Sequence, residues 1–179
     1  MIHALVGAMF LGAVSTLGDF IWAFFHVRHR TAYGILHGAV ICLCIGLVIG
    51  WRSRRLSAGA VAGPAVGVAA AGLFYVLAPF LRYGAMYVAW MFFWCCFALL
   101  QEQLSISRDY RFMAIRGLAA ALASGAAFYA LGIWREDPGP QNYVIEFISW
   151  SCAFLPGFVA LFVGRSAPVN DTAPIGATK

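Results

Sequence analysis

Six long apolar runs follow one another along the chain and are separated by short polar connections. They cover residues 4–25, 33–51, 59–80, 84–100, 113–134 and 143–164. A helix needs about 20 apolar residues to cross the hydrocarbon core of a bilayer. The runs are continuously apolar, whereas the strands of a membrane β-barrel alternate with a period of two residues. The pattern therefore predicts an all-α integral membrane protein with six transmembrane helices.

The composition agrees with a chain whose main solvent is lipid. Of its 179 residues, 63% are hydrophobic and 11% are charged, whereas a soluble domain carries about 25% charged residues. We expect residues 1–164 to form one transmembrane domain. Residues 165–179 are rich in small polar residues and proline, which predicts a short disordered cytoplasmic tail.

The basic residues lie in the connections, which is the pattern of membrane orientation and not of a nucleic-acid-binding face. If the N-terminus lies inside, the inner segments hold eight of the 12 Lys and Arg residues and the outer segments hold four. This split predicts an integral protein of the cell (inner) membrane with both termini in the cytoplasm. The inner residues are Arg52, Arg54, Arg55, Arg108, Arg111, Arg116, Arg165 and Lys179; the outer ones are Arg28, Arg30, Arg82 and Arg135.

An internal repeat emerges when the chain is shifted by 54 residues against itself. Gly18, Phe20, Arg28, Tyr33 and Cys42 then fall on Gly72, Phe74, Arg82, Tyr87 and Cys96, and a further shift gives similar matches in the last two runs. We interpret the chain as three tandem helical hairpins of the same orientation. Small residues four apart, as in Gly46 and Gly50 or Gly59 and Gly63, predict close helix packing within this bundle, although a homo-oligomer is also possible.

The first hairpin differs from the others because polar residues occupy positions that are apolar in the repeat. Asp19 aligns with Leu73, and His37 aligns with Met91. A carboxylate in hydrocarbon is costly unless it is paired, so it normally faces the interior of a helix bundle. We expect Asp19 and His37 to converge there within hydrogen-bonding reach, directly or through one water, and to share a proton.

Further polar and aromatic residues recur at helical spacing near the same depth. Together they predict a cavity in the outer leaflet that binds a ligand or takes part in proton-linked chemistry. The candidate residues are Asp19, Trp22, His26, His37, Tyr87, Trp90, Trp94, Glu146 and Trp150.

The leading functional hypothesis is binding or translocation of a small or lipid-like molecule through this cavity. Imidazole and carboxylate suit zinc or iron, so a membrane-embedded metal enzyme that uses Asp19, His26, His29 and His37 is an alternative. A non-catalytic assembly subunit, in which Asp19 pairs with a nearby basic residue, is another. No catalytic residue is identified, and the sequence predicts no metal and no cofactor for the leading hypothesis.

The five cysteines lie in apolar runs, and we interpret them as small buried hydrophobic residues.

The chain has no nucleophile elbow, P-loop, dinucleotide fingerprint or HExxH motif. Its last hairpin contains Tyr129, Gly132, Ile133, Trp134, Ser149, Trp150 and Cys152. In these residues it resembles the end of the Insig-type sterol-regulatory membrane proteins, which also have six spans. The resemblance covers one hairpin and carries over no functional residue.

Overall fold

The computed structural model describes residues 1–25, 29–82, 84–105, 109–134 and 142–163. In these ranges the chain forms six α-helices and no strand, and each helix is long and apolar enough to cross a membrane. The helices are α1 (Ile2–Phe25), α2 (Arg30–Arg52), α3 (Leu56–Leu81), α4 (Gly84–Gln103), α5 (Tyr110–Trp134) and α6 (Tyr143–Phe162). Each helix begins and ends within three residues of the corresponding end of its apolar run.

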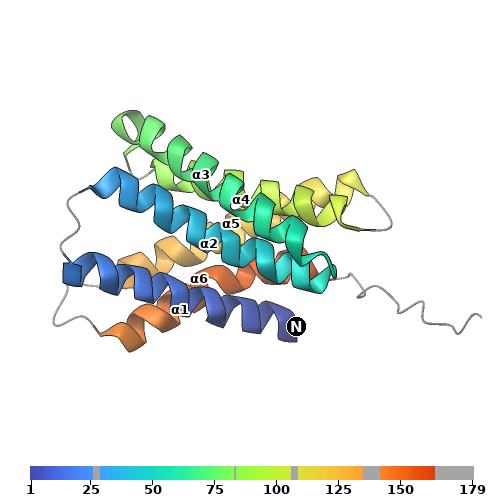
Figure 1. Cartoon of the computed structure of the whole chain (residues 1–179), viewed down its shortest axis with the longest axis horizontal. Helices are drawn as coiled ribbons and strands as arrows, with labels where there is room; N and C mark the ends of the chain where they lie inside the picture. Colours follow the sequence, from blue (N-terminus) through green and yellow to red (C-terminus); the bar gives the residue numbers. More distant parts are fainter. Residues whose placement is uncertain (26–28, 83, 106–108, 135–141, 164–179) are drawn as a thin grey trace, which may run out of the picture.

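The helices alternate in direction along the bundle (Figure 1). Helices α1, α3 and α5 begin at one end, which we call the proximal end. Helices α2, α4 and α6 begin at the other, which we call the distal end. Two helix starts are capped by side chains: Asn142 accepts hydrogen bonds from the backbone of α6, and Asp109 does the same for α5. Such caps satisfy amide groups that have no partner within the helix.

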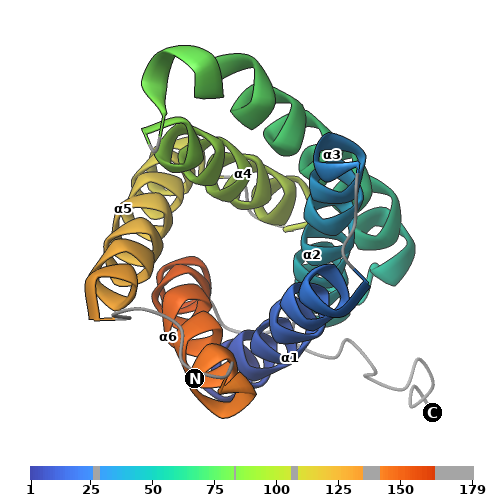
Figure 2. The same cartoon turned by 90° about the vertical axis from the view of Figure 1, so that its left-hand side faces the viewer.

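Five helices form a closed ring, and α3 packs outside it against α2 and α4 (Figure 2). Around the ring, α1 packs on α6, α6 on α5, α5 on α4, and α2 contacts both α4 and α1. The contact between α1 and α2 is slight, whereas those between α1 and α6 and between α2 and α3 are extensive. Three equivalent hairpins are therefore not shown, and the tandem repeat stays a prediction.

The predicted close packing of small residues is found between α2 and α3, within the chain itself. A Cβ atom added to Gly59 would lie 2.0 Å from the carbonyl oxygen of Gly46, and one added to Gly67 would lie 2.3 Å from that of Gly38. No side chain fits at such distances. The glycines therefore allow the two backbones to touch.

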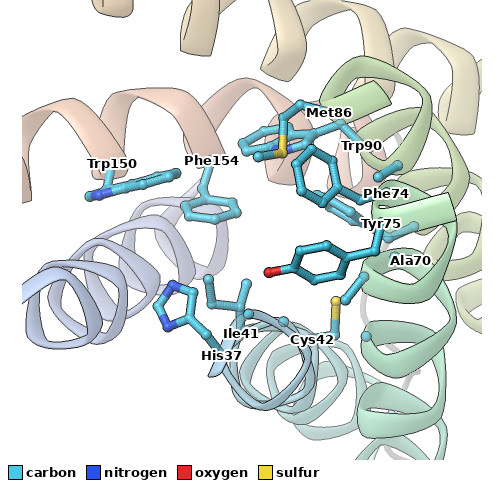
Figure 3. Close-up of a pocket in the computed structure, with 16 residues that line it drawn as sticks. His37, Ile41, Cys42, Ala70, Phe74, Tyr75, Met86, Trp90, Trp150 and Phe154 are labelled. Carbon is cyan, nitrogen blue, oxygen red and sulfur yellow. The ribbon is translucent and has the colours of Figure 1, made fainter. Parts of the chain in front are cut away.

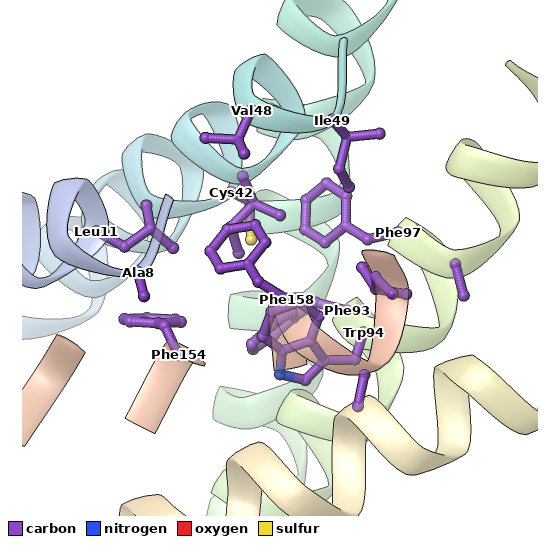
Figure 4. Close-up of a cluster of buried hydrophobic side chains, with 14 of the residues drawn as sticks. Ala8, Leu11, Cys42, Val48, Ile49, Phe93, Trp94, Phe97, Phe154 and Phe158 are labelled. Atoms are coloured by element: carbon purple, nitrogen blue, oxygen red, sulfur yellow. The ribbon is translucent and has the colours of Figure 1, made fainter. Parts of the chain in front are cut away.

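The hydrophobic core fills the proximal half of the ring. It is formed mainly by the first half of α1 and the second halves of α2, α4 and α6, together with Ala120 and Ala121 of α5. Its large side chains have little or no exposed surface (Figure 4). Trp94 and Phe158 meet edge to face here, with ring centroids 5.6 Å apart. Because side chains fill this half of the ring, the interior cavity described below lies in the distal half.

Candidate functional site

A cavity of about 210 Å³ lies in the distal half of the bundle, between α2, α3, α4 and α6. Figure 3 shows aromatic side chains from α3, α4 and α6 arranged around it, with His37 and Ile41 of α2 on the remaining side. Its surface is mostly apolar. The lining residues are Gly34, His37, Gly38, Ile41, Cys42, Gly67, Ala70, Ala71, Phe74, Tyr75, Met86, Ala89, Trp90, Phe93, Trp150 and Phe154.

One wall of the cavity is a stack of three aromatic rings from α4 and α6. Phe154 lies between two indoles: its ring centroid is 5.4 Å from that of Trp90 and 5.9 Å from that of Trp150, with interplanar angles of 18° and 23°. Phe128 of α5 contacts both indoles at ring-centroid distances of 5.2 and 5.4 Å. Since rings of this size are fixed from several sides, the wall is a rigid surface.

Tyr75 of α3 enters the cavity from the opposite side (Figure 3). Its hydroxyl donates a hydrogen bond of 3.0 Å to the backbone carbonyl of Arg30. The ring reaches this position because residue 34 is glycine: a Cβ atom there would lie 2.0 Å from the Tyr75 hydroxyl oxygen. The bond ties the end of α3 to the start of α2 and orients one side of the cavity.

Asp19 of α1 lies behind the aromatic wall and is bonded to it. The indole Nε1 of Trp150 donates a hydrogen bond of 2.7 Å to Oδ2 of Asp19. No basic side chain pairs with Asp19 within the part of the chain that the structure describes. Among the described residues, the partner of the Asp19 carboxylate is therefore the indole N–H of Trp150.

His37 lies beside Asp19 and lines the cavity. Its imidazole stacks on Tyr33 with ring centroids 5.7 Å apart and an interplanar angle of 13°. It packs against Gly18, where a Cβ atom would lie 2.1 Å from the imidazole Cε1. The Tyr33 hydroxyl donates to the carbonyl of Gly18. The site thus depends on two glycines, Gly18 and Gly34, at which any larger residue would displace a ring.

His37 packs against Gly18, the neighbour of Asp19, but the side chains of His37 and Asp19 are not directly bonded. Among the described residues, no hydrogen bond or ion pair joins Asp19 to His37. Asp19 is instead hydrogen-bonded to Trp150, which is 131 residues away in the sequence and takes the place that we expected for His37.

Three predicted site residues, His37, Trp90 and Trp150, line the cavity, and Asp19 contacts it through Trp150. Trp22 does not line the cavity, which corrects the expectation that it belongs to the cavity site. Its side chain is 44% exposed, and the guanidinium carbon of Arg30 lies 6.0 Å from its ring centroid. Trp22 is three residues beyond Asp19, so it lies on the edge of the face that Asp19 occupies and points out of the ring. His26 lies outside the described residues.

Tyr87, Trp90 and Trp94 of α4 were expected to line one cavity, but each of them packs in a different environment. Trp90 lines the cavity. Tyr87 packs instead on Gly125 and Tyr129 of α5, and Trp94 is fully buried in the core against Gly157 of α6. Seven residues of helix span about 10 Å, so side chains on one face meet successive layers of the bundle. Tyr87 and Trp94 are therefore packing residues and do not line the cavity.

Glu146 is buried in the first turn of α6 and is not part of the cavity lining. It precedes Trp150 by one helical turn, so both residues lie on the same face of α6. Two buried hydroxyl oxygens, Oγ of Ser15 and Oγ of Ser151, lie between α1 and α6 and have no hydrogen-bond partner among the described residues.

Sequence reasoning missed Tyr75, Phe74 and Phe154, which form much of the cavity surface. Tyr75 and Phe74 occur in the repeat, but nothing in the apolar pattern of α3 distinguishes the side that faces the ring. The described residues hold no group of three His, Cys, Asp or Glu side chains that could bind a metal ion. All five cysteines are unpaired thiols, and Cys42 lines the cavity.

Comparison with protein-family models, with curated proteins and with solved structures finds no match for the chain.

Proposed function

We propose that the chain is an integral membrane protein that binds a small, mainly apolar molecule in the distal cavity. Membrane insertion is supported by helices of 20 to 26 residues. At a rise of 1.5 Å per residue these lengths match a hydrocarbon core about 30 Å thick. Large apolar side chains are exposed on every helix, among them Val61, Phe80, Ile115 and Val144. Lipid would cover them.

The observation that carries the binding proposal is the aromatic cavity itself. A cavity of about 150 Å³ lined by apolar side chains stays dry and binds benzene. The cavity here, at about 210 Å³, is somewhat larger and has a rigid aromatic wall. It is smaller than the pockets of roughly 300–1,000 Å³ that take drug-sized ligands. A single ring or a short branched chain is therefore the size of ligand that fits.

The packing of the proximal half favours binding over translocation. Trp94, Phe97 and Phe158 have no exposed surface and lie between the cavity and the proximal end of the ring. A pathway across the membrane would require these side chains to separate. The assembly-subunit alternative expects a filled interior with Asp19 in a closed ion pair, and the distal cavity and the Trp150 contact of Asp19 speak against it.

Binding of fluorobenzene to the purified protein in lipid nanodiscs, followed by ¹⁹F NMR, tests this function. Ala89 lines the cavity and is 5% exposed, so Ala89→Leu should fill part of the space. We expect a saturable bound signal for the wild type and at least tenfold weaker binding for Ala89→Leu. Ala119→Leu is the matched control because Ala119 is exposed on α5. Equal binding by all three proteins, or no saturable binding by the wild type, would contradict the proposal.

A further inference from the structure

The distal cavity combines aromatic faces with a carboxylate that has no basic partner in the described chain. The stacked rings of Trp90, Phe154 and Trp150 form one wall, and Tyr75 faces them across the cavity (Figure 3). The face of an aromatic ring carries partial negative charge and attracts cations, and aromatic cages of this kind recognise quaternary ammonium groups. The walls therefore suit a positively charged organic group as well as an apolar one.

Asp19 supplies the counter-charge such a group needs. Its carboxylate accepts a hydrogen bond from the indole of Trp150, and the rings of Trp150 and His37 both line the cavity. An ionised carboxylate inside a helix bundle is costly unless it is compensated. A cation bound in the cavity would thus be separated from the Asp19 charge by a single ring.

Within the part of the chain that the structure describes, the cavity offers no equivalent site for an anion. The described residues that line it include neither lysine nor arginine. The hydroxyl proton of Tyr75 and the indole proton of Trp150 are already donated, to the carbonyl of Arg30 and to Asp19. An acidic ligand would have to approach the Asp19 carboxylate without a positive group to pair with it.

We propose that the distal cavity selects a small organic cation, a substituted ammonium group of about the size of one ring, with Asp19 as its counter-ion. This assignment rests on the proposed function and adds the charge of the ligand to it. Desolvation of an ammonium group opposes entry into an apolar cavity. Selection therefore depends on the aromatic faces and on the Asp19 charge acting together.

A matched pair of probes separates charge from shape. Choline and 3,3-dimethyl-1-butanol have nearly the same shape and differ in a quaternary nitrogen in place of a carbon atom. Binding of each to the wild-type protein in nanodiscs, measured by saturation-transfer NMR on the methyl signal, should favour choline by about tenfold or more. Asp19→Asn keeps an acceptor for the Trp150 indole and removes the charge, so it should reduce this preference to about twofold or less.

Asp109→Asn is the control for the loss of one negative charge. Asp109 caps α5 at the proximal end, far along the bundle from the cavity, so this variant should keep the wild-type preference. The proposal is overturned if the wild type binds the alcohol as tightly as choline, or if Asp19→Asn retains the full preference. The wild-type comparison needs no variant and decides the matter even if Asp19→Asn fails to fold. Saturable fluorobenzene binding without a preference for choline would leave the proposed function standing and remove only this assignment.

Discussion

The indole Nε1 of Trp150 donates a hydrogen bond of 2.7 Å to Oδ2 of Asp19 and so joins α6 to α1 across 131 residues of sequence. The bond closes the ring between its first and last helices and places the Asp19 carboxylate against the wall of the cavity. Hydrogen bonds to charged groups contribute about 1.5–3 kcal/mol to stability, compared with about 0.5–1.5 kcal/mol for neutral pairs. Asp19 and Trp150 should therefore be energetically coupled.

A double-mutant cycle measures this coupling. Trp150→Phe removes the donor and leaves the carboxylate unsatisfied, so it should destabilise the protein by about 2 kcal/mol or more. In the Asp19→Leu background the same change should cost about 1–2 kcal/mol less. Unfolding in mixed micelles, followed by circular dichroism, gives the four free energies. Additive effects of the two substitutions would show that the bond contributes nothing to the folded state.

The contact between α2 and α3 should be sensitive to a single methyl group. A Cβ atom at residue 59 would lie 2.0 Å from a backbone oxygen of α2, and overpacking of this kind costs about 1–3 kcal/mol or more. Gly59→Ala should lower the free energy of unfolding by at least that amount. Gly72→Ala is the control on the same helix because nothing lies within 4 Å of its added Cβ atom; it should be neutral or slightly stabilising. Equal effects at the two positions would argue against this helix contact.

Gly18→Ala should act on the cavity more than on the bundle. The added methyl group would lie 2.1 Å from the His37 imidazole, and the ring can move only toward the cavity or away from Tyr33. We expect fluorobenzene affinity to fall by about tenfold, with the free energy of unfolding reduced by about 1–2 kcal/mol. Gly84→Ala, where the added Cβ atom would meet its nearest neighbour at 3.6 Å, should leave the affinity unchanged. An unchanged affinity in Gly18→Ala would show that the imidazole position does not shape the site.

The orientation in the membrane follows from the eight-to-four split of basic residues between the two sides. It predicts that residue 53, in the connection between α2 and α3 at the proximal end, lies in the cytoplasm. Residue 30, at the distal end, should lie outside. Ser53→Cys should be protected from a membrane-impermeant maleimide added to intact cells, and Arg30→Cys should be labelled. The reverse pattern would invert the topology.

The sequence predicted the helices well because the length of an apolar run directly reflects bilayer thickness. It also predicted that Gly46 and Gly59 serve close packing inside the chain. It could not predict which helices are neighbours. Helices that are apolar on all sides give no sign of which face meets protein and which meets lipid, so the pairing of α1 with α6 and the approach of Tyr75 to the cavity were not foreseen.

Because the sequence does not show which helices are neighbours, only some of the candidate site residues line the cavity. Asp19 and His37 stood out in the sequence because charged or ionisable residues are rare in apolar runs. Trp90 and Trp150 stood out because they are expected at a similar depth in the membrane. Trp22, Tyr87 and Trp94 satisfied the same criteria, yet they lie at the surface, against α5 and in the core. Depth can be read from the sequence, but the direction in which an aromatic side chain points depends on the neighbouring helix.

The location of a bound probe tests the central claim most directly. We expect crystals grown with bromobenzene to show an anomalous bromine peak in the distal cavity, between Trp90, Tyr75 and His37. The Ala89→Leu variant should lose that peak. Bromine peaks confined to the lipid-facing surface of the bundle, with none inside the ring, would contradict the account.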